Sequence, residues 1–143
     1  MIAQRNILLA DDSPDDAELT LISLRKTADS LSVEVMHDGV EVLNYLGIGP
    51  DPAALSELPL LILLDLKMPR LDGFSVLSRL KTDAILRRIP VVMLTSSQEP
   101  EDISACYQLG ANAYVVKSME FGRYADTLDA VQRFWVGANQ IAR

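Results

Sequence analysis

Apolar runs of strand length recur along this chain, and each is followed by a polar turn. Five of these runs predict strands, at residues 6–10, 32–37, 60–64, 91–95 and 112–116. The run at 60–64 is wholly apolar, which is typical of a parallel strand covered on both faces, whereas 32–37 alternates as a half-buried strand does. We therefore expect 60–64, with the sequence LLILL, to be the central strand of a sheet.

Segments with helical spacing of apolar residues follow the strand-like runs. They begin near Ser13, Asp38, Phe74, Pro100 and Met119. The first helix is expected to have Ser13 as its N-cap and Pro14 as its first residue. Asp15 and Asp16 then fall in its first turn, where negative charge suits the helix dipole. The chain thus alternates five strands with five helices.

This alternation predicts an α/β fold with a doubly wound parallel sheet, because right-handed crossovers place helices on both faces. The ends of the first, third, fourth and fifth strands then lie along one edge of the sheet, where open α/β sheets bind ligands. Five polar residues follow those strand ends and are expected to share one crevice: Asp11, Asp12, Asp65, Thr95 and Lys117.

Composition narrows the possible partners. The chain has 143 residues, 49% of them hydrophobic, which suits one domain with a full core and leaves no room for a linker or an output domain. A net charge of -7 and a pI near 4.6 argue against binding to nucleic acid or to an anionic membrane. No signal peptide or membrane-spanning run is visible, so we expect a cytoplasmic protein. The single cysteine, Cys106, is expected to be a small buried residue.

The chemistry of the predicted crevice points to a divalent cation. Three neighbouring carboxylates repel one another unless a cation neutralises them, and hard oxygen ligands suit Mg²⁺ better than zinc. A metal-bound carboxylate beside a fixed lysine and a hydroxyl can also accept a phosphoryl group. Each residue has an ordinary structural alternative, because paired aspartates often cap turns and a lysine after a strand is usually solvated. Five such residues at strand ends favour a site.

The chain resembles the receiver domains of two-component response regulators over essentially its whole length. Four pieces in order carry this resemblance: ILLADD at 7–12, LLDLKMPRLDG at 63–73, VVMLTSS at 91–97 and GANAYVVK at 110–117. The resemblance implies a flavodoxin-like, CheY-like sheet of strand order 2-1-3-4-5 with five helices. It also implies a switch rather than a metabolic enzyme, phosphorylated by a histidine kinase.

The resemblance assigns a role to each polar position. Asp65 would be the phosphoacceptor. Asp12 and Asp65 would bind Mg²⁺ directly, with Asp11 acting through water and Lys67 through its backbone carbonyl.

The remaining positions would read the phosphoryl group. Thr95 would hydrogen-bond it, Lys117 would pair with it, Ser96 is small as the family requires, and Tyr114 would move inward with Thr95. The signal would emerge on the surface of the fourth helix, fifth strand and fifth helix. The chain departs from the family in one place, since Ser118 stands where receivers usually have a proline after the lysine.

Two other functions compete with this hypothesis. A Mg²⁺-dependent phosphohydrolase of the haloacid-dehalogenase type would also use Asp65 as nucleophile, but it would need an aspartate two residues later, where Lys67 stands. A degenerate receiver that only docks would be expected to have lost some of the polar positions, and all five are intact.

The length of the expected fifth helix and the apolar residues near its end predict a homodimer. From Met119 to about Asn139 it would run roughly 30 Å, while a five-residue strand covers about 17 Å, so its last turns should project past the sheet. Phe134, Trp135 and Ile141 would form the contact. In the alternative, Trp135 folds back over its own sheet. A helix ending in Phe-Trp also resembles the small regulators that serve phytochrome-type histidine kinases.

Overall fold

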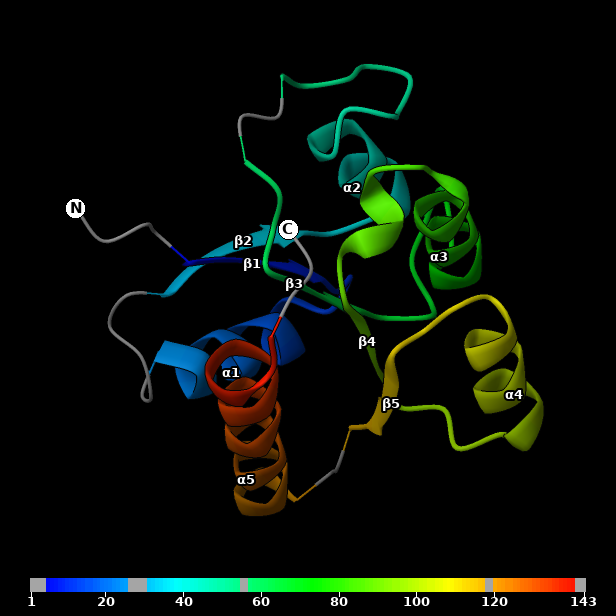
Figure 1. The fold of residues 1–143 in the computed structure, drawn as a ribbon. Helices are drawn as coiled ribbons and strands as arrows, with labels where there is room; N and C mark the ends of the chain where they lie inside the picture. Colours follow the sequence, from blue (N-terminus) through cyan, green and yellow to red (C-terminus); the bar gives the residue numbers. More distant parts are fainter. Residues whose placement is uncertain (1–4, 26–30, 55–56, 118–119, 141–143) are drawn as a thin grey trace.

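One parallel sheet of five strands runs through the middle of the molecule in the order β2-β1-β3-β4-β5 (Figure 1). The computed structural model describes residues 5–25, 31–54, 57–117 and 120–140. The strands are β1 (Arg5–Ala10), β2 (Leu31–Met36), β3 (Leu61–Leu64), β4 (Val91–Thr95) and β5 (Ala113–Val116). The predicted fold class and strand order are confirmed.

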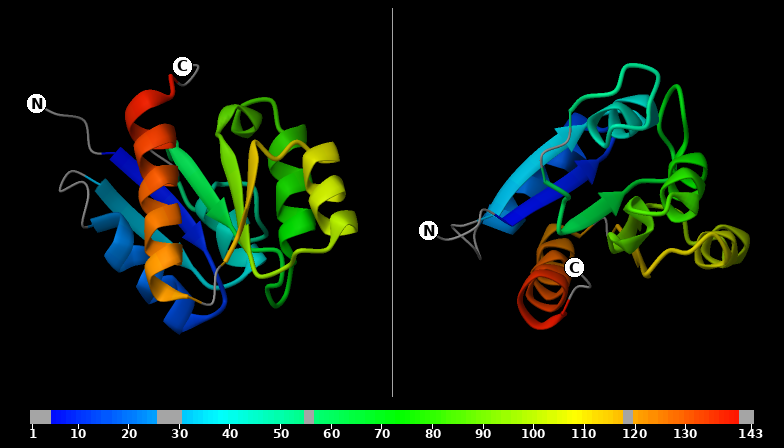
Figure 2. Two further views of the ribbon diagram at one scale, coloured as in Figure 1. Left: turned by 90° about the horizontal axis from the view of Figure 1, so that it is seen from below. Right: turned by 45° about the horizontal axis from the view of Figure 1, so that its top comes forward.

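Helices cover both faces of the sheet. The five α-helices are α1 (Pro14–Arg25), α2 (Gly39–Tyr45), α3 (Gly73–Thr82), α4 (Pro100–Gln108) and α5 (Phe121–Gln132). Helices α1 and α5 lie side by side on one face, and α2, α3 and α4 lie on the other (Figures 1 and 2). None of the helices among the described residues combines the length and apolarity that crossing a bilayer requires.

The central strand β3 holds the two layers together. Ile62 and Leu64 point into the core beneath α2, α3 and α4, while Leu61 and Leu63 point into the core beneath α1 and α5. All four side chains are completely buried. Full burial of one such side chain stabilises a fold by about 1.5–3 kcal/mol, which is why the strand is apolar at every position.

The strand register brings the polar residues together at the carboxyl edge of the sheet. Ala10 of β1 pairs with Leu64 of β3, so Asp11 and Asp65 leave their strands side by side. The Asp65 N–H donates to the Ala10 carbonyl over 3.0 Å, which fixes this exit. On the other side of β3, the Lys117 N–H donates to the Thr95 carbonyl over 2.8 Å.

The helix starts follow the chemistry of the sequence. The Ser13 hydroxyl accepts the Asp16 N–H over 3.3 Å at the start of α1. Asp38 caps α2 by accepting the Glu41 N–H over 2.8 Å, and the Glu41 carboxylate in turn accepts the His37 N–H over 2.6 Å. This reciprocal pair resembles a capping box.

The sequence patterns do not predict two short helices that the structure contains. The segment after α3 forms a 3₁₀ turn, η1 (Leu86–Arg88), because the Asp83 carboxylate accepts the N–H groups of Ile85 and Leu86, each over 2.9 Å, and Leu86 is buried. The last turns of the fifth helix are a π-helix, η2 (Arg133–Ala138).

The end of the fifth helix extends beyond the neighbouring strands, as the left view of Figure 2 shows. Its two aromatic residues differ in environment. Trp135 is partly buried and packs against the core beneath α1 and α5, as in the alternative arrangement, whereas the Phe134 side chain is 52% exposed. Ile141 and Ser118 lie outside the described residues.

Gly73 is predicted to be required for full stability, because α3 begins directly against the end of β3. A Cβ atom at this position would collide with the backbone of Asp65 and Leu66. Gly73→Ala should lower the free energy of unfolding by about 1–3 kcal/mol in urea denaturation. Gly122→Ala on α5 is the control, because a Cβ there meets nothing within 4 Å. Equal stability of the two variants would contradict the prediction.

Candidate functional site

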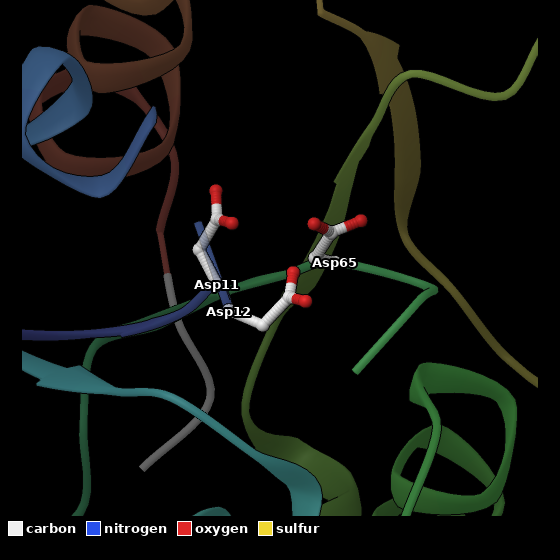
Figure 3. Close-up of side chains that lie close together, drawn as sticks. All are labelled: Asp11, Asp12 and Asp65. Atoms are coloured by element: carbon white, nitrogen blue, oxygen red, sulfur yellow. The ribbon is translucent and has the colours of Figure 1, made fainter. Parts of the chain in front are cut away.

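Three carboxylates gather at the carboxyl edge of the sheet, two after β1 and one after β3. The oxygen atoms of Asp11, Asp12 and Asp65 that could bind an ion lie within 4.8 Å of one another. Figure 3 shows the three side chains standing together, with the carboxyl group of Asp12 turned toward that of Asp65. Asp11 and Asp65 are buried, at 1% and 7% exposure, whereas Asp12 is exposed.

Lys117 reaches this cluster from the end of β5. Its Nζ lies 2.8 Å from Asp11 Oδ2, 3.1 Å from Asp65 Oδ2 and 3.1 Å from Asp16 Oδ2. Its side chain is only 10% exposed. Burial by itself would lower the pKa of Lys117, but the hydrogen bond to Asp11 and the charges of Asp65 and Asp11 outweigh burial and raise the pKa above its ordinary value. The ammonium is therefore fully charged at neutral pH.

The buried position of Asp11 is unfavourable for its charged form. Burial raises the pKa of Asp11 above its ordinary value, and the nearby charge of Asp65 raises it further. The hydrogen bonds from Lys117 and from the Ser13 N–H, the latter over 3.0 Å, oppose this rise without cancelling it. The cluster holds more negative charge than one ammonium offsets, so additional positive charge would be favourable there.

The donor set fits a hard divalent cation. All three side chains that could hold an ion offer carboxylate oxygens, the ligands that Mg²⁺, Ca²⁺ and Mn²⁺ prefer. A cavity of about 480 Å³ opens beside the cluster, and its lining includes Asp12, Lys67 and Met68. Lys67 is exposed and lies two residues after Asp65 along the chain. Asp11, Asp12 and Asp65 could therefore hold a metal ion.

A second group of predicted residues lies at the end of β4. Thr95 is buried, and its hydroxyl oxygen accepts the Ser97 N–H over 3.3 Å. The Tyr114 hydroxyl donates to the Ser97 carbonyl over 2.9 Å, and burial raises the pKa of Tyr114, so the phenol remains a donor. The Ser97 hydroxyl donates to Asp102 of α4 over 2.6 Å. Ser97 therefore links Thr95, Tyr114 and α4.

The structure brings together most of the site expected from the sequence. Asp11, Asp12, Asp65 and Lys117 form the charged cluster, and Thr95 joins it through its backbone bond to Lys117. Tyr114 already lies inward, packed against the core beneath α2, α3 and α4. Ser96 is exposed at the start of the loop after β4.

Two residues of this region have contacts that the sequence does not predict. The sequence places Asp16 in the first turn of α1, and in the structure Asp16 also pairs with Lys117. The sequence gives Ser97 no role of its own, and in the structure Ser97 takes part in four hydrogen bonds of the β4–α4 loop. Their positions in sequence give one signal, since both follow a strand end by a few residues.

The comparisons with known proteins agree with this geometry. The response regulator receiver domain matches residues 7–129 of the chain. Response regulator Rcp1 of Synechocystis sp. is 34% identical over 130 residues, which make up 91% of this chain and 88% of Rcp1.

Solved structures give the same result. The phosphorylated cyanobacterial phytochrome response regulator RcpA superposes with a TM-score of 0.90 at 32% identity, over 99% of this chain and 100% of RcpA. The Mn²⁺-bound form of Rcp1 superposes with a TM-score of 0.89 at 32% identity, over 97% of this chain and 99% of Rcp1.

Mg²⁺ is predicted to stabilise the protein through the carboxylate cluster. An ion that binds only the folded chain adds about 2.7 kcal/mol to the free energy of unfolding at a hundredfold excess over its Kd. Asp12→Asn should lose most of this gain, because it removes an exposed ligand without disturbing the core. The measurement is thermal unfolding with and without Mg²⁺. Asp126→Asn, an exposed position on α5, should keep the full gain. A full gain in Asp12→Asn would exclude Asp12 as a ligand.

Proposed function

The chain belongs to the family of response regulator receiver domains, and from this premise we propose that Asp65 accepts a phosphoryl group from the phosphohistidine of a histidine kinase. One observation carries the proposal. The Asp65 carboxylate is 7% exposed, with an ammonium 3.1 Å from Oδ2 and two further carboxylates at ion-binding distance. This arrangement supports a nucleophile held ready beside a phosphoryl site.

In the proposed reaction, a carboxylate oxygen of Asp65 attacks phosphorus, an O–P bond forms, and the N–P bond of the phosphohistidine breaks. The leaving imidazole keeps the electron pair of that bond. The Lys117 N–H that now faces Asp65 Oδ2 would donate to a phosphoryl oxygen and balance its negative charge. Burial of Asp65 keeps water away from the attacking oxygen.

We assign the cation to Mg²⁺, held by Asp11, Asp12, Asp65 and the backbone carbonyl of Lys67. When bound, the ion would neutralise charge on the phosphoryl oxygens. The oxygen-only donor set and the likeness to Mn²⁺-bound Rcp1 support this assignment.

The phosphoryl group would act as a switch by adding charge near Thr95 and Lys117. The Thr95 hydroxyl accepts the Ser97 N–H, so its own proton is available to a new acceptor. A shift of Thr95 toward the phosphoryl group would pull on Ser97, and through Ser97 on Tyr114 and α4. These contacts support an output surface formed by α4, β5 and α5.

In this proposal the protein is a phosphoacceptor in the cytoplasm, not an enzyme that turns over a metabolite. A phosphohydrolase would need a general acid two residues after the nucleophile, and Lys67 supplies a cation there. The likeness to the phytochrome response regulator RcpA supports a phytochrome-type histidine kinase as the partner.

We also propose a homodimer through the fifth helix. Phe134 supports it, because this large apolar side chain is 52% exposed near the end of the fifth helix. The Phe134 ring meets the Trp135 ring edge-on, with centroids 5.1 Å apart, and Trp135 packs against its own core. Phe134 would therefore make the contact, with Trp135 as its support.

Asp65→Asn should abolish phosphorylation and keep the fold, since it removes the nucleophilic oxygen but little volume. Incubation with acetyl phosphate and Mg²⁺, followed by intact-mass analysis, measures the adduct. The unchanged chain should accumulate an acid-stable, hydroxylamine-labile adduct, and so should Asp126→Asn. Continuous release of phosphate without an adduct would instead indicate a phosphohydrolase. The absence of both an adduct and phosphate release would indicate a docking protein.

Phe134→Glu should convert a dimer into a monomer, because it places a charge in the proposed contact. Light scattering at several protein concentrations, before and after phosphorylation, measures the mass. Ile85→Glu is the matched control, since Ile85 is 61% exposed and lies before η1, far along the chain from α5. A monomeric mass of the unchanged chain in both states would remove the dimer from the proposal.

A further inference from the structure

Asp16 is a fourth carboxylate at the site, and its side chain pairs with Lys117. Its Oδ2 lies 3.1 Å from the Lys117 Nζ, the same distance as Asp65 Oδ2. It does not belong to the group of oxygens that could hold an ion. Asp16 therefore acts on the site through Lys117.

The backbone of Asp16 is fixed on both sides. Its N–H donates to the Ser13 hydroxyl, and its carbonyl accepts the Thr20 hydroxyl over 2.9 Å. Thr20 is completely buried and also bonds the hydroxyl of Tyr124 on α5 over 2.8 Å. The Asp16 carboxylate reaches Lys117 from this position, so the contact depends on where the start of α1 lies relative to the end of β5.

The contact between Asp16 and Lys117 uses one of the hydrogen-bond donors of the ammonium group. An ammonium has three N–H groups, and the three carboxylates of Asp11, Asp16 and Asp65 occupy all of them. Asp11 and Asp16 can keep their bonds when Asp65 is phosphorylated. The third N–H is then directed at the position where the phosphoryl group forms.

We infer that Asp16 is a positioning residue, which together with Asp11 fixes two N–H groups of Lys117 so that the third meets the phosphoryl group on Asp65. The inference rests on the proposed phosphoacceptor function of Asp65. It assigns a role in phosphoryl uptake to the first turn of α1, outside the metal ligands and the residues of the β4–α4 loop.

An alternative explains Asp16 by the dipole of α1 alone. Asp15 separates the two explanations, because it lies in the same first turn with the same charge but is exposed to solvent. If the dipole were the reason, the two aspartates would be equivalent. If Lys117 is the reason, Asp16 alone should matter to the site.

The test compares Asp16→Asn with Asp15→Asn in the full chain. The first measurement is the NMR signal of the Lys117 ammonium, without metal and without phosphorylation. Its protons should exchange with water faster in Asp16→Asn than in the unchanged chain, and at the unchanged rate in Asp15→Asn. The second is the rate of labelling by acetyl phosphate at saturating Mg²⁺. It should fall about two- to fivefold in Asp16→Asn, the range given by partly exposed ion pairs, and remain within error in Asp15→Asn.

The outcomes separate this inference from the function on which it rests. Failure of the unchanged chain to become labelled would overturn the phosphoacceptor function, and with it the role of Asp16 in uptake. Labelling of Asp16→Asn at the unchanged rate, or equal slowing in Asp15→Asn, would overturn the positioning role and leave the phosphoacceptor intact. Because the Asp16 side chain is 43% exposed, the variant should fold, and circular dichroism checks that it does.

Discussion

The ion pairs of Lys117 with Asp11 and Asp65 are the interaction on which the site depends. They join the ends of β5, β1 and β3, three strands of one sheet, at its carboxyl edge. A buried ion pair contributes little net stability, because desolvation offsets most of the attraction. Loss of the ammonium would nevertheless leave Asp11, at 1% exposure, as an uncompensated buried charge. Lys117 thus makes it possible to bury the carboxylates of Asp11 and Asp65.

The apolar strands and the charged edge serve opposite purposes within a few residues. The four residues of β3 are completely buried and fix the backbone, and Asp65 follows directly. Gly73 then brings the start of α3 against the backbone of Asp65, which limits movement on that side. A rigid frame around Asp65 would suit the oriented phosphoryl transfer that we propose. The polar loops after β1, β3 and β4 are free to carry the chemistry because the core carries the stability.

Lys117 and Thr95 connect the charged cluster to different helices. Through Asp16 and Thr20, Lys117 is tied to the buried hydroxyl of Tyr124 on α5. Through Ser97, Thr95 is tied to Tyr114 and to α4. In the proposed mechanism both residues would respond to the same phosphoryl group. The two connections give a physical reason for expecting the output on α4, β5 and α5 rather than on the opposite side of the sheet.

Local rules are enough to predict the strands, the helix starts and the carboxylates of the site from the amino-acid sequence. An apolar run such as 60–64 must be buried, Ser13 and Asp38 can cap a helix, and parallel strands place their following residues on one edge. Asp11, Asp12, Asp65 and Lys117 could be grouped for that reason alone.

Contacts that depend on how the helices and strands pack cannot be predicted from local rules and are seen in the folded molecule. The pairing of Asp16 with Lys117 requires the start of α1 to lie close to the end of β5, and no local pattern fixes that distance. Trp135 and Phe134 are consecutive in the helix and point in different directions, so packing against the core buries part of Trp135 and leaves Phe134 exposed. Local sequence sets which residues stand at an edge, and packing sets which of them touch.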